Sequence, residues 1–130
     1  MIVVDASVVA EVLLRTADGI AIFERLAVGG RMWHAPHLLD VEVMHVLRRY
    51  AALGDLPPAR AAEAVELLRM LPLRRHSHEP LLERMWTLRA NFTAYDSAYV
   101  ALAEGLRAPL VTRDRRMANV KGLGITVEVV

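Results

Sequence analysis

The chain begins with "MIVVDASVV", residues 1–9. Residues 2–4 form an apolar run with no polar alternation, and Asp5 ends it. This pattern is typical of a strand buried on both faces in a parallel sheet, because a strand with one wet face alternates apolar and polar residues. A helix is predicted directly after it, over residues 6–15.

Short apolar segments alternate with helical segments along the rest of the chain. The further predicted strands are "RMWHAP", "LPLRRH", "LVT" and "ITVEVV", at residues 31–36, 71–76, 110–112 and 125–130. The further predicted helices cover residues 20–28, 37–53, 57–70, 80–89, 93–105 and 114–119. This alternation predicts a three-layer α/β/α fold with a central parallel sheet of four to five strands. Ligands of such sheets bind outside the carboxyl ends of the strands, where the strand order reverses.

Length and composition narrow the function classes. A chain of 130 residues without a composition break fits one domain, and the absence of cysteine excludes disulfides and thiolate chemistry. No basic leader precedes Asp5 and no apolar run approaches the roughly 20 residues of a membrane span, so we expect a cytoplasmic protein. The net charge of +1 does not mark the whole surface as a nucleic-acid binder. A hydrophobic content of 55% predicts an apolar patch that a partner or a second copy covers.

Four of the fifteen acidic residues stand at unusual positions. Asp5 and Asp114 follow the first and fourth predicted strands. Glu42 and Asp96 have apolar neighbours three and four positions away on their predicted helices, and these neighbours share their helix face. Because an isolated ionised carboxylate is costly to bury, these positions need a specific explanation.

Each acid also has a purely structural explanation. Asp5 and Asp114 are candidate caps for the helices that follow them, and Asp96 fits the spacing of a capping box. Glu42 can pair with Arg49 or with His45, which lies one turn after Glu42. Caps do not explain Glu42, however, and they do not explain why acids gather at the expected ligand edge of the sheet. The alternative is that all four carboxylates converge.

Converging carboxylates point to a metal ion. They repel one another unless a divalent cation neutralises them, and oxygen ligands without cysteine favour Mg²⁺ or Mn²⁺ over Zn²⁺. Such an ion activates water and stabilises charge on a phosphoryl oxygen, which is the chemistry of phosphodiester hydrolysis. Ser7 and Thr112 stand close to two of the acids and are candidates to orient a carboxylate or a water, although each is alternatively a plain cap or turn residue.

Four segments resemble the acidic motifs of the PIN-domain ribonucleases, and most of all the toxin half of VapBC toxin–antitoxin pairs. They are "MIVVDASVV", "APHLLDVEVMHVLRR", "NFTAYDSAYVALAE" and "PLVTRDRRM", in the family's order along the whole chain. The resemblance implies that Asp5, Glu42 and Asp96 are the family's acidic triad. Asp114 matches the frequently present fourth acid.

The same resemblance implies an activity and partners. It implies an endoribonuclease that depends on Mg²⁺ or Mn²⁺ and leaves 5′-phosphate and 3′-hydroxyl ends. It also implies a homodimer and a cognate antitoxin whose tail covers the active site, and it supplies Ser7 and Thr112 as supporting hydroxyls. One departure is His45, which stands where many relatives carry Asn and bears on local geometry.

Other side chains receive weaker interpretations. Arg113, Arg115 and Arg116 flank the fourth acid, and we expect at least one of them to contact substrate or an antitoxin carboxylate. The histidine pairs His34/His37 and His76/His78 lack a third ligand nearby, so they are interpreted as loop or surface residues. The Trp and Tyr residues are interpreted as core or interface packing rather than base-stacking platforms.

Three other functions are alternatives to an RNA-cleaving toxin. A DNA or structure-specific nuclease shares the same acids but usually needs further elements to clamp DNA. A phosphoacceptor domain calls for D-x-D after the first strand and a Lys on a late strand, whereas this chain has Asp5-Ala6-Ser7 and its one lysine at Lys121. A non-catalytic PIN module that serves only as a binding surface typically loses acids, and all four are present here.

Overall fold

The computed structural model describes all residues, 1–130. Its strands are β1 (Ile2–Val4), β2 (Trp33–Pro36), β3 (Leu73–His76), β4 (Leu110–Thr112) and β5 (Val127–Val129). Its helices are α1 (Ala6–Leu14), α2 (Ala17–Ala27), α3 (Leu38–Ala52), α4 (Pro58–Met70), the 3₁₀ helix η1 (Glu79–Leu81), α5 (Leu82–Thr87), α6 (Ala94–Leu106) and α7 (Arg115–Ala118). None of these helices is long and apolar enough to cross a membrane.

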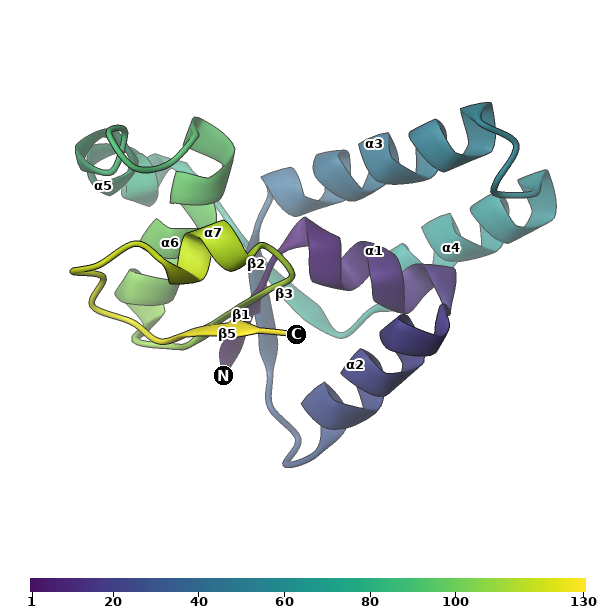
Figure 1. Cartoon of the computed structure of the whole chain (residues 1–130), viewed down its shortest axis with the longest axis horizontal. Coiled ribbons are helices and arrows are strands. Elements are labelled where there is room, and N and C mark those ends of the chain that lie inside the picture. Colours follow the sequence, from purple (N-terminus) through teal and green to yellow (C-terminus); the bar gives the residue numbers. More distant parts are fainter.

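The five strands form one parallel sheet in the order β3-β2-β1-β4-β5. Helices α1 to α4 lie on one side of the sheet, and α5 and α6 lie on the other (Figure 1). This confirms the predicted three-layer α/β/α fold and fixes the number of strands at five. The strand order reverses at β1, so the crevice beyond the carboxyl ends of β1 and β4 is the expected position for a ligand.

The core lies on both faces of the central strands. All three residues of β1 are fully buried, as are Leu110 and Val111 of β4, which explains why these strands carry no polar alternation. On one face, helix α6 contributes seven consecutive buried residues, 97–103. Most of them are Ala or Ser, whose small side chains let the helix approach the sheet closely. The start of α6 is therefore held rigidly at the carboxyl edge of the sheet.

Helix α2 begins earlier than the sequence predicts. The segment "TADG" was expected to be a loop before a helix at residue 20, but α2 begins at Ala17 because the Thr16 hydroxyl accepts a 2.9 Å hydrogen bond from the Gly19 N–H. Gly19 is buried inside this helix, where a Cβ would lie 2.0 Å from the backbone oxygen of Glu11. The glycine therefore marks the close approach of α2 to α1 and not a turn. The predicted helix over residues 80–89 is likewise divided into η1 and α5.

This close approach makes a prediction for the two helical glycines. We expect Gly19→Ala to lower the free energy of unfolding by about 1–3 kcal/mol, because the added methyl group forces α1 and α2 apart. The control is Gly105→Ala in α6, where nothing lies within 4 Å of an added Cβ. There the lost backbone freedom of the unfolded chain should raise stability by roughly 0.4–1 kcal/mol. Urea denaturation measures both variants, and equal stability of the two would contradict the packing argument.

Candidate active site

A pocket of about 560 Å³ lies at the carboxyl edge of the sheet, next to the ends of β1 and β4. It is called the acidic pocket below. Its lining residues are Asp5, Ala6, Ser7, Val41, Glu42, His45, Val46, Tyr95, Asp96, Tyr99, Asp114 and Met117. The structure thus brings together all four acids singled out in the sequence, although they are separated by up to 109 residues along the chain (5 to 114).

Asp5 is the most deeply held of the four acids. It is 7% exposed, and its Oδ1 accepts hydrogen bonds from the Ser7 hydroxyl (2.6 Å) and the Val8 N–H (3.1 Å). The Thr112 hydroxyl donates to its Oδ2. Burial raises the pKa of Asp5 above its ordinary range, although these hydrogen bonds act in the opposite direction. The hydrogen bond from the Val8 N–H confirms that Asp5 caps α1, and the same carboxylate also lines the acidic pocket.

The two predicted hydroxyls connect β1 to β4 as well as orienting Asp5. The Thr112 hydroxyl accepts a 2.9 Å hydrogen bond from the Asp114 N–H, and the Ser7 hydroxyl accepts a 3.1 Å hydrogen bond from the Arg113 N–H. Each hydroxyl therefore donates to the Asp5 carboxylate and accepts from the backbone just after β4. This network fixes the first and fourth acids relative to each other.

Glu42 projects from α3 and is half-buried. Burial raises its pKa first, and the negative charges of Asp5 and Asp96 raise it further, whereas a hydrogen bond from the Tyr99 hydroxyl lowers it. That hydrogen bond joins Tyr99 Oη to Glu42 Oε2 at 2.5 Å. No ion pair with Arg49 or His45 forms, so this structural alternative is wrong for Glu42.

Asp96 enters the pocket from the first turn of α6. Thr93 caps this helix by accepting a 3.1 Å hydrogen bond from the Asp96 N–H. The reciprocal half of a capping box is absent, because the Asp96 carboxylate makes no hydrogen bond in the structure. Its oxygens therefore have no hydrogen-bond donor, and the carboxylates of Glu42 and Asp114 line the same pocket.

Asp114 differs from the other three acids because a cation already accompanies it. It caps α7 through the Arg116 N–H (2.9 Å), and the Arg116 guanidinium contacts both of its oxygens, at 3.0 and 2.6 Å. These contacts hold the pKa of Asp114 below its usual range. The helix-cap explanation is thus also real for this acid.

The three arginines around Asp114 do not line the acidic pocket. Arg113 pairs with Glu11 and with Asp18 (3.4 Å), so its guanidinium lies toward α1 and α2. Arg115 is exposed and has no ion-pair partner. Arg116 lines a smaller neighbouring pocket of about 190 Å³ that shares Asp96 and Asp114 with the acidic pocket. Of the three, Arg116 lies where an extended ligand in the acidic pocket would continue.

The donor set fits a hard divalent cation in its chemistry. Four carboxylates line the pocket and cysteine is absent; burial and then the charges of Asp5 and Asp96 raise the pKa of Glu42, and a bound cation would offset that repulsion. In the present side-chain conformations no three of these groups lie close enough to hold an ion. Binding therefore requires carboxylates of the pocket to rotate toward one another, and Asp96 is free to do so because no hydrogen bond holds it.

Tyr99 and His45 are among the lining residues that were not identified as site residues from the sequence. Tyr99 was interpreted as core packing, and its ring is indeed buried, but its hydroxyl reaches Glu42. Its position three residues after Asp96 is the signal that could have placed it on the pocket side of α6. His45 lines the pocket from an exposed position on α3 and makes no hydrogen bond to a neighbouring loop.

The histidine pairs differ partly from expectation. His34 is buried in β2, so the interpretation as a loop or surface residue is wrong for it. Its Nδ1 lies 2.8 Å from Nε2 of His76 on the adjacent strand. The ring of His37 packs edge-on against that of His78 at 6.1 Å. Only His34 and His76 thus pair across two strands, since His37 and His78 follow them, and no group of three histidines forms a metal site.

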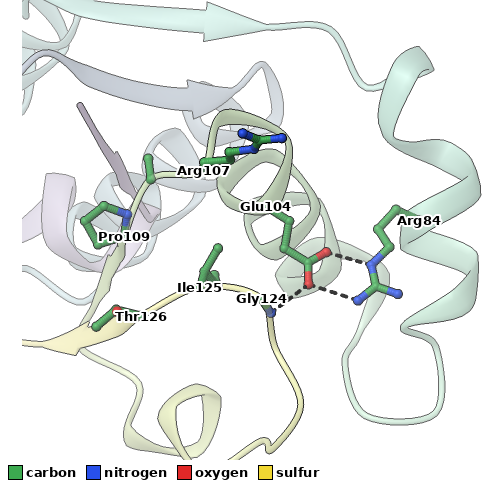
Figure 2. A pocket seen from close by; sticks show the side chains of 8 residues that line it. Arg84, Glu104, Arg107, Pro109, Gly124, Ile125 and Thr126 are labelled. Carbon is green, nitrogen blue, oxygen red and sulfur yellow. Dashed lines mark hydrogen bonds and ion pairs between the residues drawn. The ribbon is translucent and has the colours of Figure 1, made fainter.

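A larger cavity of about 670 Å³ lies at the opposite, amino edge of β4 and β5 (Figure 2). Two of its charged groups, Arg84 and Glu104, pair with each other. Arg84 donates to both oxygens of Glu104, at 2.6 and 2.9 Å, and the Gly124 N–H donates to Glu104 at 3.4 Å. This ion pair lowers the pKa of Glu104. These contacts join α5 and the loop before β5 to α6.

The doubly wound parallel sheet and its pocket of carboxylates define the class of α/β/α domains that carry an acidic site at the switch point of the sheet. The chain belongs to the PIN domain family, whose model matches residues 2–123. This confirms the resemblance found in the sequence motifs.

Individual relatives agree with this assignment. The chain is 43% identical to ribonuclease VapC9 of Mycobacterium tuberculosis over 119 residues, which cover 92% of this chain and 90% of the relative. It is 39% identical to ribonuclease VapC12 of the same organism over 130 residues, which cover 100% and 99% of the two chains.

Two solved structures share the fold at 16% identity each. A toxin–antitoxin complex from Klebsiella pneumoniae has a TM-score of 0.71 and covers 96% of this chain and 95% of that chain. VapC20 of M. tuberculosis, described as a sarcin-ricin loop cleaving toxin, has a TM-score of 0.65 and covers 85% of this chain and 87% of that chain.

The pKa of Glu42, which burial and then the charges of Asp5 and Asp96 raise, leads to a prediction for the metal-free protein. Its pKa is higher in the folded protein than in the unfolded chain, so ionised Glu42 opposes folding at neutral pH. We expect Glu42→Gln in EDTA to unfold at higher urea concentration than wild type at about pH 7.5. This advantage should shrink and disappear as the pH falls below about 4, where the wild-type carboxyl becomes protonated in the unfolded chain as well as in the folded protein. Glu83→Gln on the exposed face of α5 is the control, and an equal gain there would contradict the argument.

Proposed function

We propose that this protein is a metal-dependent endoribonuclease and the toxin of a type II toxin–antitoxin system, with residues 1–130 forming one nuclease domain. The observation that supports this most directly is the gathering of Asp5, Glu42, Asp96 and Asp114 in one pocket of a PIN domain. Identity of about 40% to VapC ribonucleases over nearly the whole chain supports RNA as the substrate. We place the activity in the cytoplasm, where RNA substrates are present.

In this proposal Asp5, Glu42 and Asp96 hold Mg²⁺ or Mn²⁺, and Asp114 assists. When bound, the ion supplies a water nucleophile at neutral pH and stabilises negative charge on a phosphoryl oxygen. Ser7 and Thr112 hold the Asp5 carboxylate in one orientation from both sides. Asp96, which no hydrogen bond holds, is the acid best able to turn toward a ligand.

We assign the contact with the RNA backbone to the arginines beside the fourth acid. Arg116 lies next to both Asp96 and Asp114, and its side chain is 88% exposed. Arg115 is exposed and unpaired, whereas Arg113 must first leave Glu11 and Asp18. A guanidinium binds a phosphate in a two-pronged manner, so Arg116 can exchange the Asp114 carboxylate for a substrate phosphate.

Two exposed apolar surfaces support the proposed partners. One lies beside the acidic pocket, where α3 and α5 flank the carboxyl edge of the sheet (Figure 1), and its members are Val41, Met44, Leu82, Trp86 and Tyr95. We assign this surface to a second copy of the chain. The other is a groove of about 590 Å³ between α1, α2 and α4, which includes Ile20, Phe23 and Met70. A groove of this apolar character leaves a separate surface for the cognate antitoxin.

Removal of one carboxylate tests the nuclease assignment. We expect Asp96→Asn to abolish cleavage of purified total RNA, with a loss larger than the roughly 10- to 100-fold typical of residues that only support a metal ligand. The fold should persist, because Thr93 caps α6 through the backbone of Asp96 and not through its carboxylate. EDTA should stop the wild-type enzyme, and added Mg²⁺ or Mn²⁺ should restore it.

The matched control is Asp55→Asn, which changes an exposed aspartate outside the pocket and should leave cleavage unchanged. Wild-type activity in Asp96→Asn, or activity that survives EDTA, would refute the assigned site. Parallel assays on single- and double-stranded DNA decide the remaining alternative, since preferential DNA cleavage would indicate a DNA or structure-specific nuclease instead.

The dimer assignment is tested at Trp86, which is 68% exposed on α5. We expect the wild-type protein to have the mass of a dimer by size-exclusion chromatography with light scattering. Trp86→Glu should shift it toward the monomer, because a buried unpaired carboxylate at an interface is strongly unfavourable. Val28→Glu, at an exposed apolar side chain after α2, is the control. A monomeric wild type, or an unchanged mass in Trp86→Glu, would overturn this assignment.

A further inference from the structure

Tyr99 contacts the acidic pocket from within the core. It lies one turn after Asp96 on α6, and only 2% of the residue is exposed. Its hydroxyl lines the pocket and donates the 2.5 Å hydrogen bond to Oε2 of Glu42. Because α6 is buried on several sides at this level, the position of the hydroxyl is set by core packing.

Glu42 has no other means of being held in place. The Tyr99 hydroxyl is its one hydrogen-bond donor in the structure, it makes no ion pair, and its Oε1 is unengaged. The two charged side chains that act on it, Asp5 and Asp96, have the same sign and raise its pKa beyond the effect of burial. Without a donor, a half-buried carboxylate on a helix would take several side-chain conformations and would be protonated more readily.

The phenol is suited to this role because it remains a donor. Burial, the hydrogen bond to Glu42 and the charges of Glu42 and Asp5 raise the pKa of Tyr99 above its ordinary range. An ionised carboxylate only accepts hydrogen bonds, so the Tyr99 hydroxyl is the donor in this contact. A buried hydroxyl also needs a partner, so its geometry and that of Glu42 are fixed together.

We propose that Tyr99 is a positioning residue, whose buried hydroxyl holds the Glu42 carboxylate in one orientation and leaves Oε1 available to a divalent cation. The inference rests on the proposed metal-dependent function. Hydrogen bonds to a metal ligand typically affect metal affinity or activity by about 10- to 100-fold. The sequence alone does not assign this role, because a tyrosine on a buried helix face reads as packing.

The test measures Mn²⁺ binding to Tyr99→Phe. The electron paramagnetic resonance signal of free Mn²⁺ reports how much of the ion remains unbound. Phe keeps the ring that packs in the core and removes one oxygen atom, so circular dichroism should show a retained fold. We expect the Mn²⁺ dissociation constant to rise by about 10-fold. Cleavage should then recover at high Mn²⁺ concentration, which a general loss of stability would not produce. The control is Tyr50→Phe on α3, where the hydroxyl makes no hydrogen bond. The Mn²⁺ dissociation constant of this variant should equal that of wild type.

A double-mutant cycle tests whether the effect passes through Glu42. In a Glu42→Gln background, Tyr99→Phe should cause little further loss of Mn²⁺ affinity, whereas independent, additive losses would overturn the inference. The two proposals fail differently. If wild type does not bind Mn²⁺, the metal-dependent function fails and this inference falls with it. If wild type binds Mn²⁺ and Tyr99→Phe binds it equally well, only the role of Tyr99 is refuted.

Discussion

The structure depends on one constraint, which is that a carboxylate must stay at the end of a fully buried strand. Asp5 meets this constraint through donors from two directions: Ser7 and Val8 of α1, and Thr112 of β4. The Asp5 N–H also donates to the Val111 oxygen, so backbone and side chain both tie β1 to β4. The two strands on which the sheet order reverses are thereby locked at the edge where the pocket opens.

The structural and functional explanations of the acids are not exclusive. Asp5 and Asp114 each cap a helix through an N–H while lining the same pocket. A cap fixes an aspartate at the start of a helix, and in this fold the helices after β1 and β4 start at the carboxyl edge of the sheet. Helix capping therefore helps to gather the acids, because it places carboxylates where the strands end. Glu42 and Asp96, whose side chains cap nothing, are the two that the pocket alone explains.

Much of this arrangement could be predicted from local sequence. Buried apolar runs such as residues 2–4 and 110–112 identify strands, and charged residues that follow them identify the ligand edge. The start of α2 could not be predicted, because Gly19 looks like a turn residue until its approach to the Glu11 backbone is known. The partners of Arg113 and Tyr99 were likewise hidden, since Asp18 and Glu42 lie 95 and 57 residues away in the chain. Long-range pairing leaves no local pattern.

Helices α1 and α6 begin at the acidic pocket, with α1 starting at Ala6 and α6 at Ala94. The amino end of a helix carries a partial positive charge, so the backbone around the pocket favours anions while the side chains repel them. The acids thus have two opposed consequences for a polyanion such as RNA. Their negative charge weakens the binding of RNA to a backbone that would otherwise attract it. In the proposed function, the same carboxylates are required for cleavage of the RNA. The affinity for RNA and the rate of its cleavage therefore depend in opposite directions on one group of side chains.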